Sequence, residues 1–205
     1  MAALVFATMP PAHAQTPVSI VALGDSLTAG LGLPVNDGFV PRLQAALAAK
    51  GIAAEIANAG VSGDTATGGL TRLDWSVPNA TDAVIVELGA NDMLRGLRPQ
   101  VTRDALDALL HRLSERRIAI LLCGMRAAPN LGADYVKSFE AIYPELAVKY
   151  DALLYPFFLD GVAGKPDLLQ SDGLHPNAVG VEVIVARILP KVQELIAPAR
   201  VRPPS

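Results

Sequence analysis

The chain has 205 residues, of which 51% are hydrophobic and 18% are charged. This composition supplies enough apolar side chains for the core of one domain and excludes an intrinsically disordered chain. Seventeen basic and twenty acidic residues give a formal net charge of −3, and aromatic residues make up only 5% of the chain. We therefore expect no nucleic-acid partner, because the chain offers neither a basic surface nor a set of stacking aromatics.

The chain has a single cysteine, Cys123, which lies in the apolar run 118–123. One cysteine excludes an internal disulfide and a cysteine-rich zinc site, and the apolar run favours a buried, unreactive thiol over a nucleophile. The three histidines are far apart in the sequence and form no HExxH pattern. The sequence therefore indicates no metal site.

The first fourteen residues differ in composition from the rest of the chain. Residues 2–9 are small and apolar, and Ala12-His13-Ala14 matches the pattern that precedes signal-peptide cleavage. We interpret residues 1–14 as the remnant of a signal peptide, although no Lys or Arg precedes the apolar stretch; a merely disordered apolar segment is the alternative. Because no later segment has the 18 or so uninterrupted apolar residues that a membrane span needs, we expect a periplasmic or secreted protein with no integral membrane span.

Short apolar runs then alternate with longer amphipathic segments. The expected elements are, in chain order, a strand at 18–23, a helix at 40–50, a strand at 53–57, a glycine-rich turn at 60–63, a strand at 83–88, a helix from residue 102 or 104 to about 116, a strand at 118–122, a helix at 134–151, a strand at 153–157 and a helix at 178–196. Pro144 is expected to kink or break its helix, and Pro190 to bend the last one.

This alternation predicts a single α/β domain over residues 15–197, with a five-stranded parallel sheet covered by helices on both faces. A proline-rich tail is expected over residues 198–205. In an open parallel sheet, ligands bind at the carboxyl ends of the strands. The loops of interest are those after Leu23, Ala57, Leu88, Leu122 and Phe157.

A serine hydroxyl follows the first strand, in the segment Gly24-Asp25-Ser26-Leu27. Taken alone, this segment is about as well explained by a turn or a helix cap as by a catalytic serine. A serine nucleophile needs a base. His13 lies in the expected signal segment, and His111 points roughly 150° away from the apolar stripe of its helix, so His175 is the best candidate.

His175 lies three residues after Asp172, in Asp172-Gly173-Leu174-His175-Pro176. A tight loop of this length can fold the carboxylate back onto the imidazole, where it would fix the tautomer and stabilise the imidazolium. The alternative is that the same residues form a turn and cap the next helix, and a D-x-x-H pattern alone has little specificity.

Two further loops offer hydrogen-bond donors for an oxyanion. Asn91 carries a side-chain amide after the third strand, and Gly63 allows close approach of a backbone N–H after the second. Both residues are also ordinary turn formers. Together with Ser26 and the Asp172–His175 pair, however, they supply the groups that acyl transfer requires.

Taken in chain order, these segments resemble the four sequence blocks of the GDSL or SGNH hydrolases over about residues 18–196. The blocks are Gly24-Asp25-Ser26-Leu27, the glycine-rich segment with Gly63, Gly89-x-Asn91-Asp92 and Asp172-x-x-His175-Pro176. A narrower similarity, to the bacterial thioesterase I, lysophospholipase L1 and arylesterase group, lies in segments 86–92, 94–97, 141–144 and 156–158. The resemblance implies a three-layer α/β/α flavodoxin-like fold. It also implies that Ser26 is the nucleophile, His175 the base and Asp172 its orienting partner, with an oxyanion hole formed by the backbone N–H groups of Ser26 and Gly63 and the amide of Asn91.

The resemblance further implies that the segment 93–98 lines the acyl site. Expected substrate contacts come from Asp25, Leu27, Met93, Leu94, Arg126 and Leu174. The expected enzyme is a serine ester hydrolase that needs no cofactor, acts as a monomer by default and takes small acyl or aryl esters, thioesters or lysophospholipids.

Two other functions remain open from the sequence. A carbohydrate O-acetyl esterase would use the same chemistry, but the crevice loops lack sugar-stacking aromatics and Trp75 is the only tryptophan. A non-catalytic lipid- or nucleotide-binding module would need no base, so the pair of Asp172 and His175 counts against it.

Overall fold

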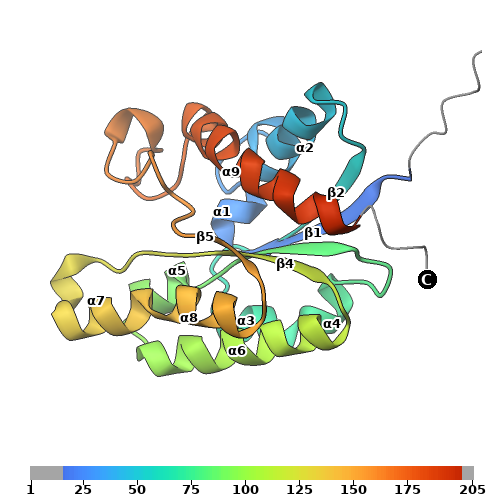
Figure 1. The fold of residues 1–205 in the computed structure, drawn as a ribbon. Helices are drawn as coiled ribbons and strands as arrows, with labels where there is room; N and C mark the ends of the chain where they lie inside the picture. The colour runs from blue at the N-terminus through green and yellow to red at the C-terminus, as the bar shows by residue number, and fades with distance from the viewer. Residues whose placement is uncertain (1–15, 200–205) are drawn as a thin grey trace, which may run out of the picture.

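A five-stranded parallel sheet lies between two layers of helices in the computed structural model, which describes residues 16–199 (Figure 1). The sheet order is β2-β1-β3-β4-β5, and every pair of neighbouring strands is parallel. The strands are β1 (Val18–Gly24), β2 (Ala54–Gly60), β3 (Ala83–Glu87), β4 (Ala119–Cys123) and β5 (Leu153–Tyr155). The predicted α/β/α fold with five parallel strands is confirmed.

The helices divide between the two faces of the sheet (Figure 1). On one face, α2 (Phe39–Ala49) packs against α9 (Ala178–Ala199). The other face carries α3 (Ala66–Thr71), α4 (Leu73–Ser76), α5 (Ala90–Leu94), α6 (Pro99–Glu115), α7 (Ala133–Glu140) and α8 (Ile142–Lys149). A short helix, α1 (Ser26–Ala29), directly follows β1, and three 3-10 turns lie at Val35–Asp37, Pro129–Leu131 and Pro166–Leu168.

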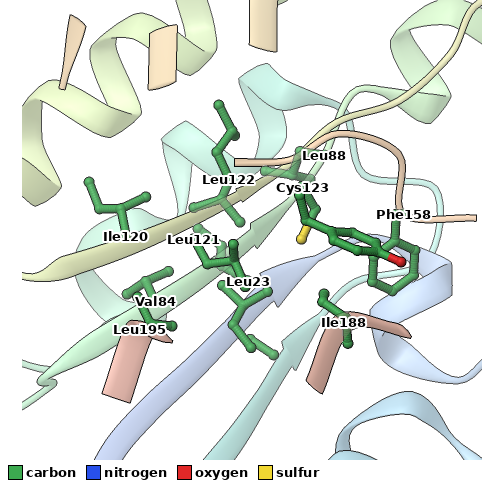
Figure 2. Close-up of a cluster of buried hydrophobic side chains, with 14 of the residues drawn as sticks. Leu23, Val84, Leu88, Ile120, Leu121, Leu122, Cys123, Phe158, Ile188 and Leu195 are labelled. Atoms are coloured by element: carbon green, nitrogen blue, oxygen red, sulfur yellow. The ribbon is translucent and has the colours of Figure 1, made fainter. Parts of the chain in front are cut away.

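The core lies on both faces of the central strands. Every residue of β3 is buried, as expected for a strand covered by helices on each side. Figure 2 shows side chains of β1, β3 and β4 meeting Ile188 and Leu195 of α9. Cys123 is fully buried in this cluster, as predicted. Each buried aliphatic side chain contributes about 1.5–3 kcal/mol, so the central strands are the most firmly held part of the molecule.

Several element boundaries differ from the prediction, each for a local reason. The helix expected at 134–151 is broken between α7 and α8 at Ala141, because Pro144 has no N–H to donate to the Glu140 carbonyl. The helix expected from residue 102 or 104 begins at Pro99, which is tolerated in the first helical turn.

The last helix, α9, is continuous through Pro190 and ends at Ala199 rather than at residue 196. It therefore includes the first two residues of the expected tail. The predicted signal segment, residues 1–14, and the tail beyond Ala199 lie outside the described residues. Within residues 16–199, none of the helices is both long and apolar enough to cross a bilayer.

The ends of three strands lie level with one another. Gly24, the last residue of β1, is paired with Gly60 of β2 and with Glu87 of β3. The loops that lead to Ser26, Gly63 and Asn91 therefore leave the sheet at the same edge. Helix α1 packs directly over this edge, because a Cβ atom on Gly60 would come within 2.3 Å of the Ala29 backbone nitrogen.

We predict that Gly60→Ala destabilises the protein by about 1–3 kcal/mol, because the new methyl group would push the backbone of α1 away from the sheet. Urea unfolding of both proteins measures the difference. Gly38→Ala is the control, since a Cβ there meets its nearest atom at an ordinary 3.6 Å, and its effect should stay under about 1 kcal/mol. Equal effects of the two substitutions would contradict the predicted close packing.

Candidate active site

Ser26, His175 and Asp172 form one hydrogen-bonded chain. The Ser26 Oγ and the His175 Nε2 are 2.8 Å apart, although the residues are 149 positions apart in the sequence. The His175 Nδ1 lies 2.6 Å from the Asp172 Oδ2. With Nδ1–H donating to the carboxylate, Nε2 is the nitrogen that accepts the Ser26 hydroxyl proton. The structure thus brings together the three residues that the sequence suggested for nucleophilic catalysis.

Ser26 is positioned by the start of α1. Asp25 is the N-cap of this helix, and its Oδ1 accepts a hydrogen bond from the Leu27 N–H at 2.9 Å. Ser26 is the first helical residue and is 8% exposed, which leaves only its hydroxyl side open to the cavity. The capping role and the candidate catalytic role therefore fall on neighbouring residues of the same turn.

A tight turn folds Asp172 onto His175. Gly173 adopts φ +70°, and the Asp172 Oδ1 accepts the N–H groups of Leu174 at 2.9 Å and His175 at 3.0 Å. These two backbone hydrogen bonds, with the one from the His175 ring, lower the pKa of Asp172 to about 2. The carboxylate is therefore ionised throughout the neutral range and stabilises a protonated His175.

The helix that follows is capped by a different residue. The Asn177 Oδ1 accepts the Gly180 N–H at 3.0 Å, at the first turn of α9. The Asn177 cap of α9 and the Asp172–His175 contact are therefore both present, and the turn at residues 172–175 leads directly into the start of α9.

The three residues expected to donate hydrogen bonds to an oxyanion, Ser26, Gly63 and Asn91, all line one cavity. The expected donors, which are the N–H groups of Ser26 and Gly63 and the Asn91 side-chain amide, stay a prediction. The Asn91 Nδ2 donates to the Asp25 Oδ2 and to the Asp64 carbonyl, each at 2.9 Å. Because both of its hydrogens are used, an incoming oxyanion would share or replace the bond to Asp25.

A cavity of about 290 Å³ opens beside Ser26. It is lined by Asp25, Ser26, Leu27, Leu31, Gly63, Ala90, Asn91, Met93, Leu94, Leu159, Leu174 and His175. Five of the six predicted substrate contacts are in this lining. The sixth, Arg126, is not, because its guanidinium stacks 4.9 Å from the Phe157 ring centre instead of turning toward Ser26.

Some lining residues had no sequence motif to mark them. Leu31 follows α1, and Leu159 lies in the loop after β5. That loop was identified as one of the crevice loops, but no polar residue in it singled out Leu159. An isolated leucine in a loop is a weak signal, because its role is set by what packs beside it.

A buried carboxyl group, Glu87, lies directly beneath the nucleophile turn. Its Oε2 accepts the Thr28 hydroxyl at 2.7 Å and the Asp25 N–H at 3.3 Å, whereas its Oε1 is buried without a hydrogen-bond partner among the described residues. Burial raises the pKa of Glu87 well above its usual value, and the negative charge of Asp25 raises it further. Burial and the neighbouring charge therefore favour the protonated, uncharged form of Glu87.

Asp25 carries the negative charge of this pair. Burial raises the pKa of Asp25 to about 6, against hydrogen bonds from the Leu27 N–H and from Glu87 that lower it. At neutral pH the ionised Asp25 accepts a hydrogen bond from Asn91, whereas burial favours the protonated form of the neighbouring Glu87. No sequence motif marks Glu87 as a functional residue, although a lone acidic residue at the end of an apolar strand is the signal that could have found it.

Comparisons with known proteins agree with the geometry. The profile of the GDSL-like Lipase/Acylhydrolase family matches residues 22–183. The chain is 36% identical to the protein named Esterase TesA of Pseudomonas aeruginosa, over 90% of this chain and 91% of that one. It is 36% identical to the Escherichia coli K12 protein named Thioesterase 1/protease 1/lysophospholipase L1, over 94% of this chain and 90% of that one. The solved structure of AlinE4, described as an SGNH-hydrolase family esterase, is 50% identical, with a TM-score of 0.74, and covers 87% of this chain and 96% of that one.

We predict that Glu87→Gln stabilises the protein relative to the parent, and that this difference in stability grows as the pH rises. The folded state holds a proton on Glu87 that the unfolded chain loses above its ordinary pKa of 4.5, so the parent loses stability between pH 4.5 and the raised folded pKa. Glutamine keeps an acceptor for Thr28 but does not titrate. Melting temperatures at pH 5 and pH 8 measure the effect, and the gain should be larger at pH 8.

The control is Glu55→Gln, because Glu55 is an exposed residue of β2. It should change the melting temperature by the same small amount at both pH values. A Glu87→Gln protein whose difference from the parent is equal at pH 5 and pH 8 would show that Glu87 is ionised in the folded state.

Proposed function

The chain belongs to the GDSL-like lipase/acylhydrolase family and is a carboxylic ester hydrolase, and we propose that Ser26, His175 and Asp172 carry out its reaction. The observation that supports this proposal most strongly is the continuous hydrogen-bonded chain from the Ser26 hydroxyl to the Asp172 carboxylate at the edge of an apolar cavity. A non-catalytic binding module would have no use for this arrangement.

The reaction begins when the His175 Nε2 removes the Ser26 proton and the Oγ attacks the carbonyl carbon of the ester. Asp172 stabilises the imidazolium that forms. His175 then gives its proton to the departing alcohol or thiol, which leaves an acyl group on Ser26. A water molecule, activated by the same imidazole, attacks this acyl-enzyme and releases the acid and free Ser26.

The negative charge on the tetrahedral intermediate is stabilised by the Ser26 and Gly63 N–H groups and the Asn91 amide. Each donor of this kind typically contributes about 3 kcal/mol to the transition state. In the unbound protein the Asn91 amide is held by Asp25 and by the Asp64 carbonyl, so it is oriented before the substrate arrives. No step of this mechanism calls on a metal or an organic cofactor.

The cavity favours an acyl chain over a sugar. Its apolar lining comes from leucine, methionine and alanine side chains, and within residues 16–199 no Phe, Tyr or Trp lines it. A volume of about 290 Å³ suits short to medium acyl groups. We therefore propose acyl or aryl esters, thioesters or lysophospholipids as the substrate class, in preference to acetylated carbohydrates.

The proposed location follows from the N-terminal sequence. The apolar N-terminal segment with its Ala12-His13-Ala14 pattern supports export to the periplasm or secretion, and an exported enzyme meets esters and lipids rather than intracellular acyl-CoA. We keep a monomer as the default assembly.

We predict that Ser26→Ala lowers the turnover of a soluble aryl ester on the order of 10⁴-fold or more. The circular dichroism spectrum should be unchanged, because the hydroxyl bonds to His175 at the edge of the cavity and not within the core. Ser138→Ala, in the exposed part of α7, is the control and should keep full activity. Turnover that survives in a folded Ser26→Ala protein would assign the nucleophile to another residue.

A further inference from the structure

A buried arginine lies behind the candidate oxyanion hole. Arg72 connects α3 to α4, and only 7% of its side chain is exposed. Its Nε donates to the Asp64 Oδ2 at 2.6 Å, its Nη2 to the Gly24 carbonyl at 2.9 Å and its Nη1 to the Ser76 Oγ at 3.1 Å. One guanidinium thus bonds to three separate segments of the chain.

Two of these acceptors adjoin the proposed oxyanion donors. Gly24 is two residues before Ser26, and its carbonyl also accepts the Val61 N–H at 3.0 Å. Asp64 directly follows Gly63. The Arg72 side chain therefore joins the loop that carries the first N–H donor to the loop that carries the second.

Asp64 connects the Ser26 and Gly63 N–H donors to the third donor, the Asn91 amide. Its carboxylate binds Arg72, while its backbone carbonyl accepts the Asn91 Nδ2 at 2.9 Å. The carboxylate has little room to shift, because a Cβ atom on Gly68 would lie 2.0 Å from its Oδ1. A movement of Asp64 would therefore displace both the Gly63 N–H and the Asn91 amide.

Stability alone is a poor explanation for this ion pair. Removing a guanidinium and a carboxylate from water costs several kcal/mol per ion, and apolar replacements of such pairs are often equally stable or more so. The ion pair instead fixes the relative positions of its partners, because the planar guanidinium sets the direction of several hydrogen bonds at once. A lysine has a single nitrogen and cannot hold the three acceptors in the same relation.

We propose that the Arg72–Asp64 ion pair sets the spacing of the Ser26 N–H, the Gly63 N–H and the Asn91 amide around the oxyanion. This inference rests on the proposed function. Neither Arg72 nor Asp64 is in the lining of the cavity, so they act through these donors. Misplaced donors weaken binding of the transition state more than binding of the substrate. Loss of the pair should therefore lower kcat and leave KM nearly unchanged.

The test uses Arg72→Lys and Asp64→Asn with a soluble aryl ester, well below the melting temperature of each variant. Each should lower kcat about 10- to 100-fold and change KM less than about threefold. The inhibition constant of a boronic acid, whose tetrahedral adduct places an oxygen where the oxyanion forms, should rise by the same factor as kcat/KM falls. Arg112→Lys is the control, because Arg112 pairs with Asp74 of α4 on the exposed side of the same region, and its kcat should equal that of the parent.

A double-mutant cycle separates positioning from a general structural role. Asn91→Ala alone should lower kcat about a hundredfold or more. If Arg72 acts through the oxyanion donors, adding Arg72→Lys to Asn91→Ala should lower kcat much less than it does in the parent. Should Arg72→Lys fail to fold, Asp64→Asn enters the same cycle.

A parent-like kcat in Arg72→Lys or Asp64→Asn would overturn the inference, as would losses that multiply fully with that of Asn91→Ala. Neither result would touch the proposed function, provided that Ser26→Ala still abolishes turnover. Turnover that persists in Ser26→Ala would instead overturn the proposed function itself.

Discussion

The hydrogen bond between Ser26 and His175 is the contact on which the site depends. It joins the end of β1 to the turn before α9, 149 residues later. The contact is possible because β1 lies inside the sheet and α9 returns along one face of it, against α2 (Figure 1). Each intervening strand then ends at the same edge, which is how Gly63 and Asn91 come to lie beside Ser26.

The environment of each carboxyl group determines its charge and so its role. Asp172 is half exposed and accepts three hydrogen bonds, so it remains ionised and supports His175. Glu87 is fully buried beside the Asp25 carboxylate, which favours its protonated form, and it accepts a hydrogen bond from Thr28 of α1. Asp25, between these extremes, orients the Asn91 amide. Three carboxyl groups thus perform three different tasks within one site.

The sequence predicted the five strands and the loops that follow them, because hydrophobic periodicity and strand ends are local features. Most of the cavity lining was instead implied by the resemblance to the SGNH hydrolases. The sequence did not predict that Arg126 would turn toward Phe157, nor that Arg72 would bond to both Asp64 and Gly24, since both depend on which segments pack together. Short helices such as α3 and α5 were also missed, because one or two turns carry too little periodicity to detect. The preference of Glu87 for its protonated form follows from burial, which a sequence alone does not give.

The catalytic roles of Ser26, His175 and the three oxyanion donors are tested most directly by a crystal structure of the protein after inactivation by a fluorophosphonate. We predict a phosphonyl group on the Ser26 Oγ, with one phosphoryl oxygen within hydrogen-bond distance of the Ser26 N–H, the Gly63 N–H and the Asn91 amide, and with His175 still bonded to Asp172. A phosphonyl group on any other residue, or an oxygen that points away from these three donors, would contradict these roles.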